Sequence, residues 1–525
     1  MIHPKPIPVI DLFAGPGGLG EGFSSLTTPD GNRLFSLKVS VEKEESAHLT
    51  LSLRALFRKF PPGQVPDCYY DHIRGYISRK ELFAHPEAAE LAREALEEAI
   101  KFELGKDNPD VLDRRIESAL NGRDDWVLIG GPPCQAYSLA GRSRRAREPQ
   151  EQFESDEKHF LYKEYLRIIR RHMPAIFVME NVKGILSSRV GGAGIFDRIV
   201  TDLSAPGSGL EYEIRSFVKA GTAKEIKPRD FVIKAERFGV PQARHRVILF
   251  GIRSDVARSM PDLLLFPDTF VLVPNPRAVT VEEVLSDLPR LRSRLSRESD
   301  SHSHWLAAIS EAYETFLREA GDTIRPMGGE IRNALAMARA PLSTGAHFLR
   351  WEAGHAKMRG QLKEWFYDPR LGGVIQHEAR SHMRSDLHRY LFAAAYARLN
   401  GVSPKIKDFP KTLLPRHENV NGNGRGVPFA DRFRVQLSHS YASTVVSHIA
   451  KDGHYYIHPD PSQCRSLTVR EAARLQTFPD NYFFAGNRSQ QYVQVGNAVP
   501  PLLAREIARV VHSLMEAWYR SRSLQ

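Results

Sequence analysis

The chain has 525 residues, 42% of them hydrophobic and 26% charged, which is an ordinary globular composition and excludes a disordered or collagen-like chain. Its formal net charge of +11 favours a polyanionic partner. Three cysteines are too few for a disulfide framework or a zinc cluster, and no apolar run approaches the roughly 20 residues that cross a bilayer. We therefore expect a cytoplasmic protein without a membrane segment.

The first predicted strand, residues 8–13, runs into a turn whose glycines match the pattern G-x-G-x-x-G. Such a turn from strand into helix lets backbone N–H groups approach a ligand closely. A second predicted strand, residues 35–41, ends at Glu42, where an acid can accept hydrogen bonds from ribose hydroxyls. These features predict a nucleoside cofactor, and both NAD and S-adenosylmethionine (SAM) are compatible with them.

Residues 78–122 have a different character. Residues 87–103 show helical periodicity and consist largely of strong helix formers, and residues 111–120 predict a second helix. We interpret this stretch as a helical insertion between sheet elements, on the surface and without chemistry of its own.

An apolar run at residues 125–129 predicts a buried strand, which a Gly-Gly-Pro-Pro sequence stops just before Cys134. The stiff turn presents the cysteine at the carboxyl end of a strand, the edge where open α/β sheets bind ligands. A thiolate is a strong nucleophile. A lone cysteine is more often buried and inert, but a packing cysteine needs no rigid turn around it. The basic run at residues 141–147 is either a solvated loop or a loop that contacts phosphate.

Two further segments place polar residues beside predicted strands. The strand at residues 174–179 ends at Glu180, and residues 238–246 lead into a strand at residues 247–251. Strand alternation puts Arg244 and Arg246 on one face. Arginines on a buried strand are costly unless they meet anions or acceptors, so these two predict a polar site.

Taken together, these segments resemble the DNA (cytosine-5)-methyltransferases. Six motifs occur in that family's order, namely residues 11–18 (DLFAGPGG), 131–135 (GPPCQ), 180–182 (ENV), 242–246 (QARHR), 467–479 (LTVREAARLQTFP) and 494–501 (QVGNAVPP). They cover residues 1–255 and about 440–525. Where the family's third motif reads Gly-Asp-Ile, the nearest stretch is Tyr70-Asp71-His72-Ile73, which makes Asp71 the candidate adenine contact.

The resemblance implies an α/β fold, a doubly wound SAM-methyltransferase (Rossmann-like) sheet with a second, smaller target-recognition domain. It implies a catalytic domain at residues 1–255, a target-recognition region at 256–440, and C-terminal motifs at 441–525 that return to the catalytic domain. The implied cofactor is SAM, and its candidate contacts are Asp11, Phe13, Gly15, Gly18, Glu42, Asp71 and Asn497. Because Asn497 lies far along the chain, the C-terminal helix is expected to fold back beside the first strand.

The resemblance also implies a mechanism. Cys134 would add to C6 of cytosine, Glu180 would bind N3 and the exocyclic amine, and Arg246 would hold O2 with support from Arg244. The base would have to be flipped out of the duplex to be reached. Candidate DNA contacts near the nucleophile are Gln135, Ser138 and Arg142.

The middle of the chain matches no motif and carries most of the charge. Residues 291–440 hold 23 Lys and Arg against 15 Asp and Glu. Helices are predicted at residues 300–320 and 376–400, the second a basic helix whose Arg380, Arg384 and Arg389 contact phosphates. His377 and His382 have the spacing H-E-x-x-x-H, which does not align two zinc ligands, so we assign no metal. In the irregular loop at 404–424, Arg416 and Asn419 are candidate base-reading residues.

The leading hypothesis is a SAM-dependent enzyme that methylates duplex DNA, tied to restriction-modification or phage defence, with a possible cognate endonuclease or defence-system partner at the nucleoid. Three alternatives remain open: an RNA-directed relative, an NAD-linked oxidoreductase, and a non-catalytic DNA-binding subunit. The oxidoreductase explains neither Cys134 nor the two arginines. The intact set of Cys134, Glu180 and Arg246 argues against a non-catalytic subunit.

Overall fold

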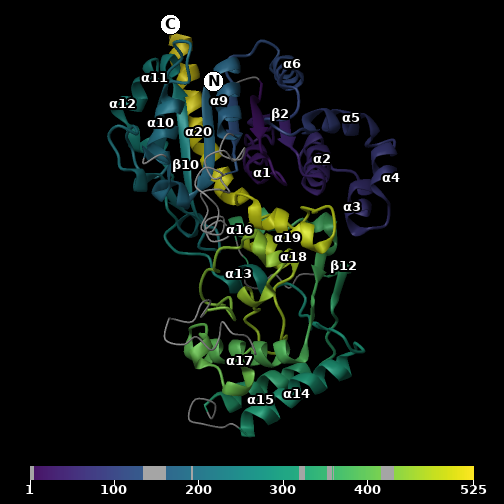
Figure 1. Ribbon diagram of the computed structural model, residues 1–525. Helices are drawn as coiled ribbons and strands as arrows, with labels where there is room; N and C mark the ends of the chain where they lie inside the picture. Colours follow the sequence, from purple (N-terminus) through teal and green to yellow (C-terminus); the bar gives the residue numbers. More distant parts are fainter. Residues whose placement is uncertain are drawn as a thin grey trace.

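Figure 1 shows the computed structural model, in which a sheet with helices on both faces stands above a smaller helical part. The structure describes residues 5–133, 161–190, 193–318, 326–351, 358, 360–415 and 431–524. Within these ranges, no helix is both long enough and apolar enough to span a lipid bilayer.

The central sheet has eight strands, seven of them in the order β3-β2-β1-β4-β5-β10-β8, with β9 added beside β10. The strands from β3 to β5 run parallel to one another, and β10 is antiparallel to both of its neighbours. Their bounds are β1 Ile7–Leu12, β2 Phe35–Glu42, β3 Ala99–Lys101, β4 Val127–Gly130, β5 Ile176–Val182, β8 Tyr212–Ser216, β9 Val232–Lys234 and β10 His245–Arg253. The predicted parallel α/β sheet is therefore confirmed.

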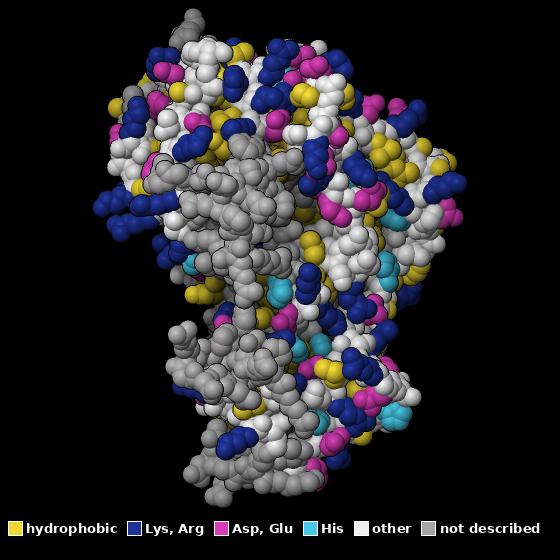
Figure 2. All heavy atoms as spheres, in the orientation of Figure 1, with side chains coloured by type: hydrophobic (Ala, Val, Ile, Leu, Met, Phe, Trp, Pro, Cys, Tyr) yellow, Lys and Arg dark blue, Asp and Glu magenta, His cyan; other side chains and the backbone are white. Residues whose placement is uncertain are grey.

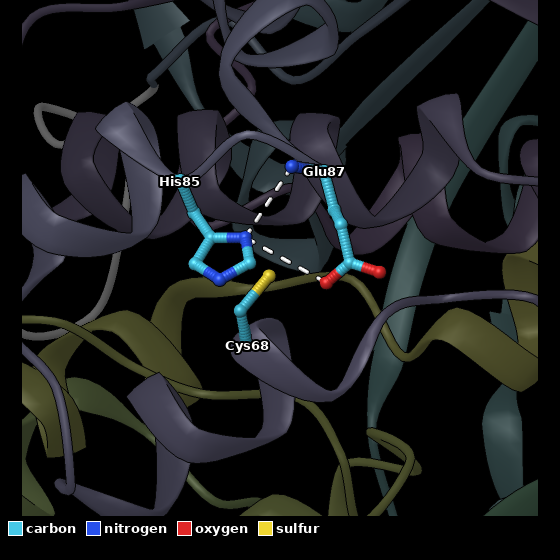
Figure 3. Close-up of side chains that lie close together, drawn as sticks. All are labelled: Cys68, His85 and Glu87. Carbon is cyan, nitrogen blue, oxygen red and sulfur yellow. Dashed lines mark hydrogen bonds and ion pairs between the residues drawn. The ribbon is translucent and has the colours of Figure 1, made fainter.

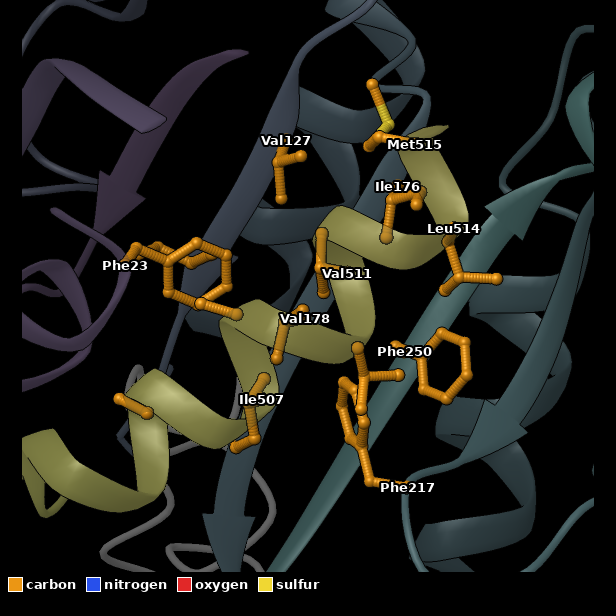
Figure 4. Close-up of a cluster of buried hydrophobic side chains, with 14 of the residues drawn as sticks. Phe23, Val127, Ile176, Val178, Phe217, Phe250, Ile507, Val511, Leu514 and Met515 are labelled. Carbon is orange, nitrogen blue, oxygen red and sulfur yellow. The ribbon is translucent and has the colours of Figure 1, made fainter. Parts of the chain in front are cut away.

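Helices cover both faces of this sheet because its inner strands are apolar on both sides. In β1, Ile7 and Val9 face one core while Ile10 and Leu12 face another. The C-terminal helix α20 (Pro501–Leu524) packs on the first face, where Ile507, Val511 and Leu514 lie against strand side chains (Figure 4). The second face is covered by α6 (Pro109–Leu120), α9 (Leu161–His172) and α10 (Ile195–Ser204).

Glycines of the first helix, α1 (Gly18–Ser24), permit a very close approach of the C-terminal segment. A Cβ on Gly18 would lie 2.2 Å from the carbonyl oxygen of Val499, and a Cβ on Gly22 would lie 2.4 Å from Cβ of Ala504. No side chain larger than hydrogen fits at these positions unless the backbone moves. The predicted return of the C-terminus to the first strand is confirmed.

The expectation for residues 78–122 is wrong in its central part. The helix predicted through residue 103 ends at Glu98, and the next three residues form β3 at the edge of the sheet. Helix α6 then links β3 to β4. Apart from α4 (Arg79–Ala84) and α5 (Ala89–Glu98), the stretch therefore consists of ordinary crossover elements of the sheet rather than an insertion.

The smaller part is built on a separate helical core. Helices α14 (His302–Arg318), α15 (Met327–Ala338) and α17 (Arg384–Asn400) pack together there. The helix predicted at residues 300–320 is confirmed, but the one predicted at 376–400 begins only at Arg384. The residues before it form β13 (Gly373–Glu378), which pairs with β12 (Gly345–Arg350), and the short β14 (Ser381–His382).

A third hydrophobic core packs residues 279–288 against the C-terminal motifs. Side-chain packing therefore links the two parts in addition to the connecting chain. The expected domain boundaries near 255 and 440 stay predictions. The remaining elements are α2 (Glu45–Lys59), α3 (Asp67–Arg74), α11 (Ser254–Arg258), α12 (Pro261–Leu265), α13 (Val281–Leu285), α16 (Gln361–Phe366), α18 (Val469–Leu475), α19 (Arg488–Asn497), β6 (Arg189–Val190), β7 (Ala193–Gly194) and β11 (Arg294–Leu295), together with short 3-10 turns.

The contact between α1 and α20 predicts the result of a single methyl insertion. Gly22→Ala should lower the free energy of unfolding by about 1–3 kcal/mol because the added carbon overlaps Ala504. The matched control is Gly329→Ala in α15, where nothing lies within 4 Å of the added Cβ. The control should be neutral or more stable by about 0.5–1 kcal/mol. Denaturant unfolding of both variants checks this, and equal stability would contradict the close packing.

Candidate active site

The glycine-rich turn after β1 forms one side of the candidate site. Gly15 and Gly17 have φ values of 56° and 96°, a backbone that other residues rarely adopt. The N–H of Gly15 donates a 2.9 Å hydrogen bond to Oε2 of Glu42, which ends the neighbouring strand β2. A Cβ on Gly15 would meet nothing within 4 Å, so the turn is open at this residue.

Asp11 in β1 is fully buried beside this turn. Among the described residues, its carboxylate oxygens make no hydrogen bond of full geometry, although the backbone N–H of Gly20 lies close enough to lower its pKa. Burial raises its pKa to about 8, and the nearby charge of Glu42 acts in the same direction. Burial likewise raises the pKa of Glu42. An unpaired buried carboxyl is unusual, and it marks this strand end as a place suited to a polar ligand.

Most of the predicted cofactor residues meet at this turn. Phe13 follows β1 with a φ of 56°, which is strained for a residue with a side chain. The contact of Gly18 with Val499 brings the end of α19, and with it the exposed Asn497, against the turn.

Asp71 is not brought to this turn. It lies on α3, where its carboxylate pairs with Arg74 at 3.1 Å. The strand next to β2 is β3, and the first acid beyond it is Glu103, whose carboxylate pairs with Lys43 at 2.9 Å. Glu103 was not among the residues expected from the sequence, because the segment before it has helical periodicity. The apolar pair at residues 99–100 is the only sequence signal of the strand that precedes Glu103.

The second side of the site is formed where β4, β5 and β10 lie side by side. Glu180 in β5 pairs with Arg246 in β10, with 2.8 Å between Oε1 and Nε, and both side chains are only about 15% exposed. A Cβ on Gly131 would lie 3.0 Å from Oε2 of Glu180, so the Gly-Pro-Pro turn after β4 lies directly against this pair. Cys134 follows three residues later.

Six predicted site residues lie outside the described residues, namely Cys134, Gln135, Ser138, Arg142, Arg416 and Asn419.

Arg244 differs from Arg246 in its surroundings. It is 1% exposed and donates to the backbone carbonyls of Val445 at 2.8 Å and Gly496 at 3.1 Å. Burial, followed by the charge of Arg246, lowers the pKa of Arg244 well below its usual value. These contacts suit a residue that supports the structure around the site. The guanidinium of Arg246, in contrast, pairs with Glu180.

The sequence pattern of the family described as "C-5 cytosine-specific DNA methylase" matches residues 100–513. A curated relative, Type II methyltransferase M.Bpa9945I of Bacillus paralicheniformis, is 33% identical over 97% of this chain and 99% of its own length. The chain belongs to the C-5 cytosine-specific DNA methylases. It is accordingly a DNA (cytosine-5-)-methyltransferase.

Two further similarities agree with this assignment. Type II methyltransferase M.AgeI of Thalassovita gelatinovora is 27% identical over 96% of this chain and 98% of its own length. A crystal structure of a prophage-encoded DNA modification methyltransferase (E. coli) superposes with a TM-score of 0.54 at 18% identity, covering 97% of this chain and 99% of that one. At that identity the second similarity shows the fold alone.

The three arginines expected to hold DNA phosphates in this methyltransferase are engaged within the protein. Arg380 stacks 3.9 Å from the ring centroid of Tyr492 and donates to the carbonyl of Ile449. Arg384 pairs with Glu298 at 2.8 Å and with Glu311 at 2.9 Å. Arg389 donates to the carbonyl of Leu413 at 2.7 Å and pairs with Asp386 at 3.0 Å. These arginines therefore already have partners within the protein, and their contact with DNA phosphates stays a prediction.

His377 and His382 are also buried rather than directed at DNA. The ring of His377 bonds to Thr468 Oγ1 at 2.9 Å and to the carbonyl of Pro289 at 2.8 Å. Burial lowers the pKa of His377 to about 4 and that of His382 to about 3, so both rings are neutral at physiological pH.

In the Q-x-R-x-R motif of this enzyme, we expect Arg244 to matter mainly for stability and Arg246 mainly for catalysis. Arg244→Met should lower the free energy of unfolding by about 1–3 kcal/mol because it leaves two buried carbonyls without a donor. Arg246→Met should cost less stability, about 1 kcal/mol or less, because solvent still reaches the Glu180 carboxylate that it leaves behind, and it should abolish most methylation. Denaturant unfolding and a methyl-transfer assay on both variants check this. If the Arg246 variant lost as much free energy of unfolding as the Arg244 variant, these separate roles would be contradicted.

Proposed function

We propose that this methyltransferase acts through the thiolate of Cys134, with Glu180 and Arg246 holding a cytosine flipped out of duplex DNA. The observation that carries the proposal is the Glu180–Arg246 pair, which lies against the turn leading into Cys134. The pair is polar, partly buried and preformed. It offers a carboxyl and a guanidinium on the same edge of the sheet, as recognition of a cytosine ring requires.

The chemistry then follows from the ring. C5 of cytosine is a poor nucleophile, and addition of the Cys134 thiolate at C6 converts the ring into an enamine that is nucleophilic at C5. Glu180 contacts N3 and the exocyclic amine and shares a proton with N3. Arg246 donates to O2, where negative charge accumulates, and Arg244 fixes the strand that carries it. Once C5 has formed its bond to the methyl group and the methyl–sulfur bond of the donor has broken, a base takes the C5 proton. The C6–sulfur bond then breaks, which restores the ring and releases the Cys134 thiolate.

The residues around the first turn fit SAM as the methyl donor. The unpaired carboxyl of Asp11 and the open space at Gly15 suit a polar ligand, and Glu42 is held at the end of β2, where a ribose is recognised in folds of this type. Phe13, Gly18 and Asn497 would complete the pocket. SAM supplies an electrophilic methyl group when bound. The family assignment disfavours NAD as the ligand of this turn.

The biological context follows from the relatives. Those described above are named type II methyltransferases. We infer that this enzyme likewise belongs to a restriction-modification or phage-defence system and works on the nucleoid in the cytoplasm, with a cognate endonuclease as the expected partner. RNA remains the alternative substrate. A methyl-transfer assay that compares duplex DNA with RNA decides between the two.

A pocket suited to a DNA phosphate lies where the predicted recognition region meets the C-terminal segment. It has a volume of about 350 Å³, and its lining combines the basic Arg432, His448 and Lys451 with the acidic Asp386 and Asp452. His448 lies in the 3-10 turn Ser447–Ala450, which begins two residues after Val445, the acceptor of Arg244. A Cβ on Gly496 of α19 would lie 2.3 Å from the backbone of this turn. The pocket wall is therefore continuous with the segments that support Arg246.

Among the described residues on the face in Figure 2, lysine and arginine side chains are spread among acidic ones and form no continuous basic band. DNA binding then depends more on individual exposed lysines and arginines. Lys451 is exposed at the pocket, whereas Arg432 lies 3.6 Å from Asp452. We propose Lys451 as a phosphate contact.

Replacement of the nucleophile tests the mechanism. Cys134→Ser should reduce methyl transfer by at least about a thousandfold, because a hydroxyl cannot replace a thiolate in attack on C6. DNA carrying 5-fluorocytosine should trap the wild-type enzyme covalently, since fluorine does not leave as a proton does. The matched control is Cys464→Ser, whose thiol is buried and bonded to the carbonyl of Pro461. Appreciable turnover by the Cys134 variant would remove this residue from the mechanism.

Salt dependence tests the phosphate contact. Lys451→Ala should weaken binding to a mixed-sequence duplex and reduce the slope of log K against log salt by about 0.9, the value for one phosphate. The matched control is Arg384→Ala, which should leave the slope unchanged because Arg384 is already paired with two glutamates. Equal slopes for Lys451→Ala and wild type would place the phosphate contacts elsewhere without affecting the methylation mechanism.

A further inference from the structure

Three potential metal ligands converge on the helical layer outside the active site. Cys68 lies in the first turn of α3, His85 follows α4, and Glu87 lies between α4 and α5. Figure 3 shows their side chains directed toward one another. One ligand atom from each, a sulfur, a nitrogen and an oxygen, lies within 4.8 Å of the other two.

We propose that this cluster binds a divalent transition-metal ion of the zinc type. Thiolate, imidazole and carboxylate are the ligands that zinc takes in proteins, and its bond lengths set ligand atoms about 3.3–3.7 Å apart in a tetrahedral site. Nδ1 of His85 and Oε2 of Glu87 already lie 3.6 Å apart. The cluster therefore needs only a small contraction around an ion.

Nδ1 of His85 is the nitrogen that is available to bind the ion. The backbone N–H of Glu87 donates to Nδ1 of His85 at a long 3.3 Å, which identifies Nδ1 as the unprotonated nitrogen and aims its lone pair toward Glu87. An ion at Nδ1 would replace this weak contact. Nε2 would then carry the proton and keep the ring neutral, as metal ligation requires.

The electrostatic surroundings favour a cation. Among the described residues, no lysine or arginine pairs with the Glu87 carboxylate, whose Oε2 lies 3.6 Å from Nδ1 of His85. A divalent ion would bind the thiolate and neutralise the carboxylate. His85 and Glu87 are partly exposed, which leaves an entry path and room for a water as fourth ligand.

The site would have a structural role. It would join α3 to the connection between α4 and α5, and α5 is anchored on the sheet side through Glu98, which pairs with Arg58 of α2 at 2.7 Å. Arg58 lies in turn 3.9 Å from Glu21 in α1, the helix that begins at the glycine-rich turn. A metal clip here would therefore stabilise the outer layer of the cofactor-binding half.

Cobalt is a suitable probe, because a cobalt–thiolate bond gives an intense near-ultraviolet charge-transfer band. The full-length protein, stripped with chelator and kept reduced, would be titrated with Co²⁺, followed by Zn²⁺ to displace it. Four single variants are compared: Cys68→Ser, Cys134→Ser, Cys464→Ser and His85→Ala. We expect wild type and the Cys134 and Cys464 variants to bind one equivalent with the band, Cys68→Ser to lose the band, and His85→Ala to bind at least about tenfold more weakly.

Each outcome decides the question independently of methylation. A full band in Cys68→Ser, its loss in Cys134→Ser, or its absence in wild type would overturn the site. His85→Ala guards against misfolding of the Cys68 variant, since His85 is a partly exposed residue outside the regular helices. Zn²⁺ should also raise the Tm of wild type and not that of Cys68→Ser, and an equal rise in both would count against the proposal.

Discussion

The active site of this methyltransferase depends on a set of buried amide and guanidinium hydrogen bonds that join three distant parts of the chain. Gln242 is 0% exposed and donates to the carbonyl of Leu475 at 2.8 Å, while its own oxygen accepts the N–H of Val445 at 2.8 Å. Gln476 extends the set to the carbonyl of Val495 at 2.6 Å. Arg246, two strand residues beyond Arg244, can be held near Glu180 only while these bonds fix the start of β10.

The same segments complete the cofactor side, which explains why motifs almost 500 residues apart belong to one site. Helix α19 ends at Asn497, and the two residues that follow it bring Val499 against Gly18 of the first helix. The close approach of Val499 needs a glycine at residue 18. The bonds that join Leu475 and Val445 need the buried amide of Gln242. Loosening of the C-terminal segment would therefore disturb both sides of the candidate site together.

The sequence was sufficient to predict the strands of the sheet interior, because a parallel strand covered on both faces is a continuous apolar run, as in β1 and β4. It misled at β3, where Ala99 follows a helix of alanines and glutamates and only tertiary pairing with β2 makes the segment a strand. It also misled at β13, where a helix-compatible sequence is held extended against β12. The roles of Arg244 and Arg246 looked equal from spacing alone, and burial separates them.

The charge of the middle segment illustrates a more general limit on such reasoning. Net charge counts side chains, whereas DNA responds only to cations that are exposed and not already paired. Arg380, Arg384 and Arg389 contribute to the count, yet each already has a ring, a carbonyl or a carboxylate as its partner. A paired arginine would have to lose that partner before gaining a phosphate, so its net contribution to affinity is small. Lys451 lies just beyond this segment, exposed beside the support of Arg246, where a phosphate would align the backbone with the catalytic edge.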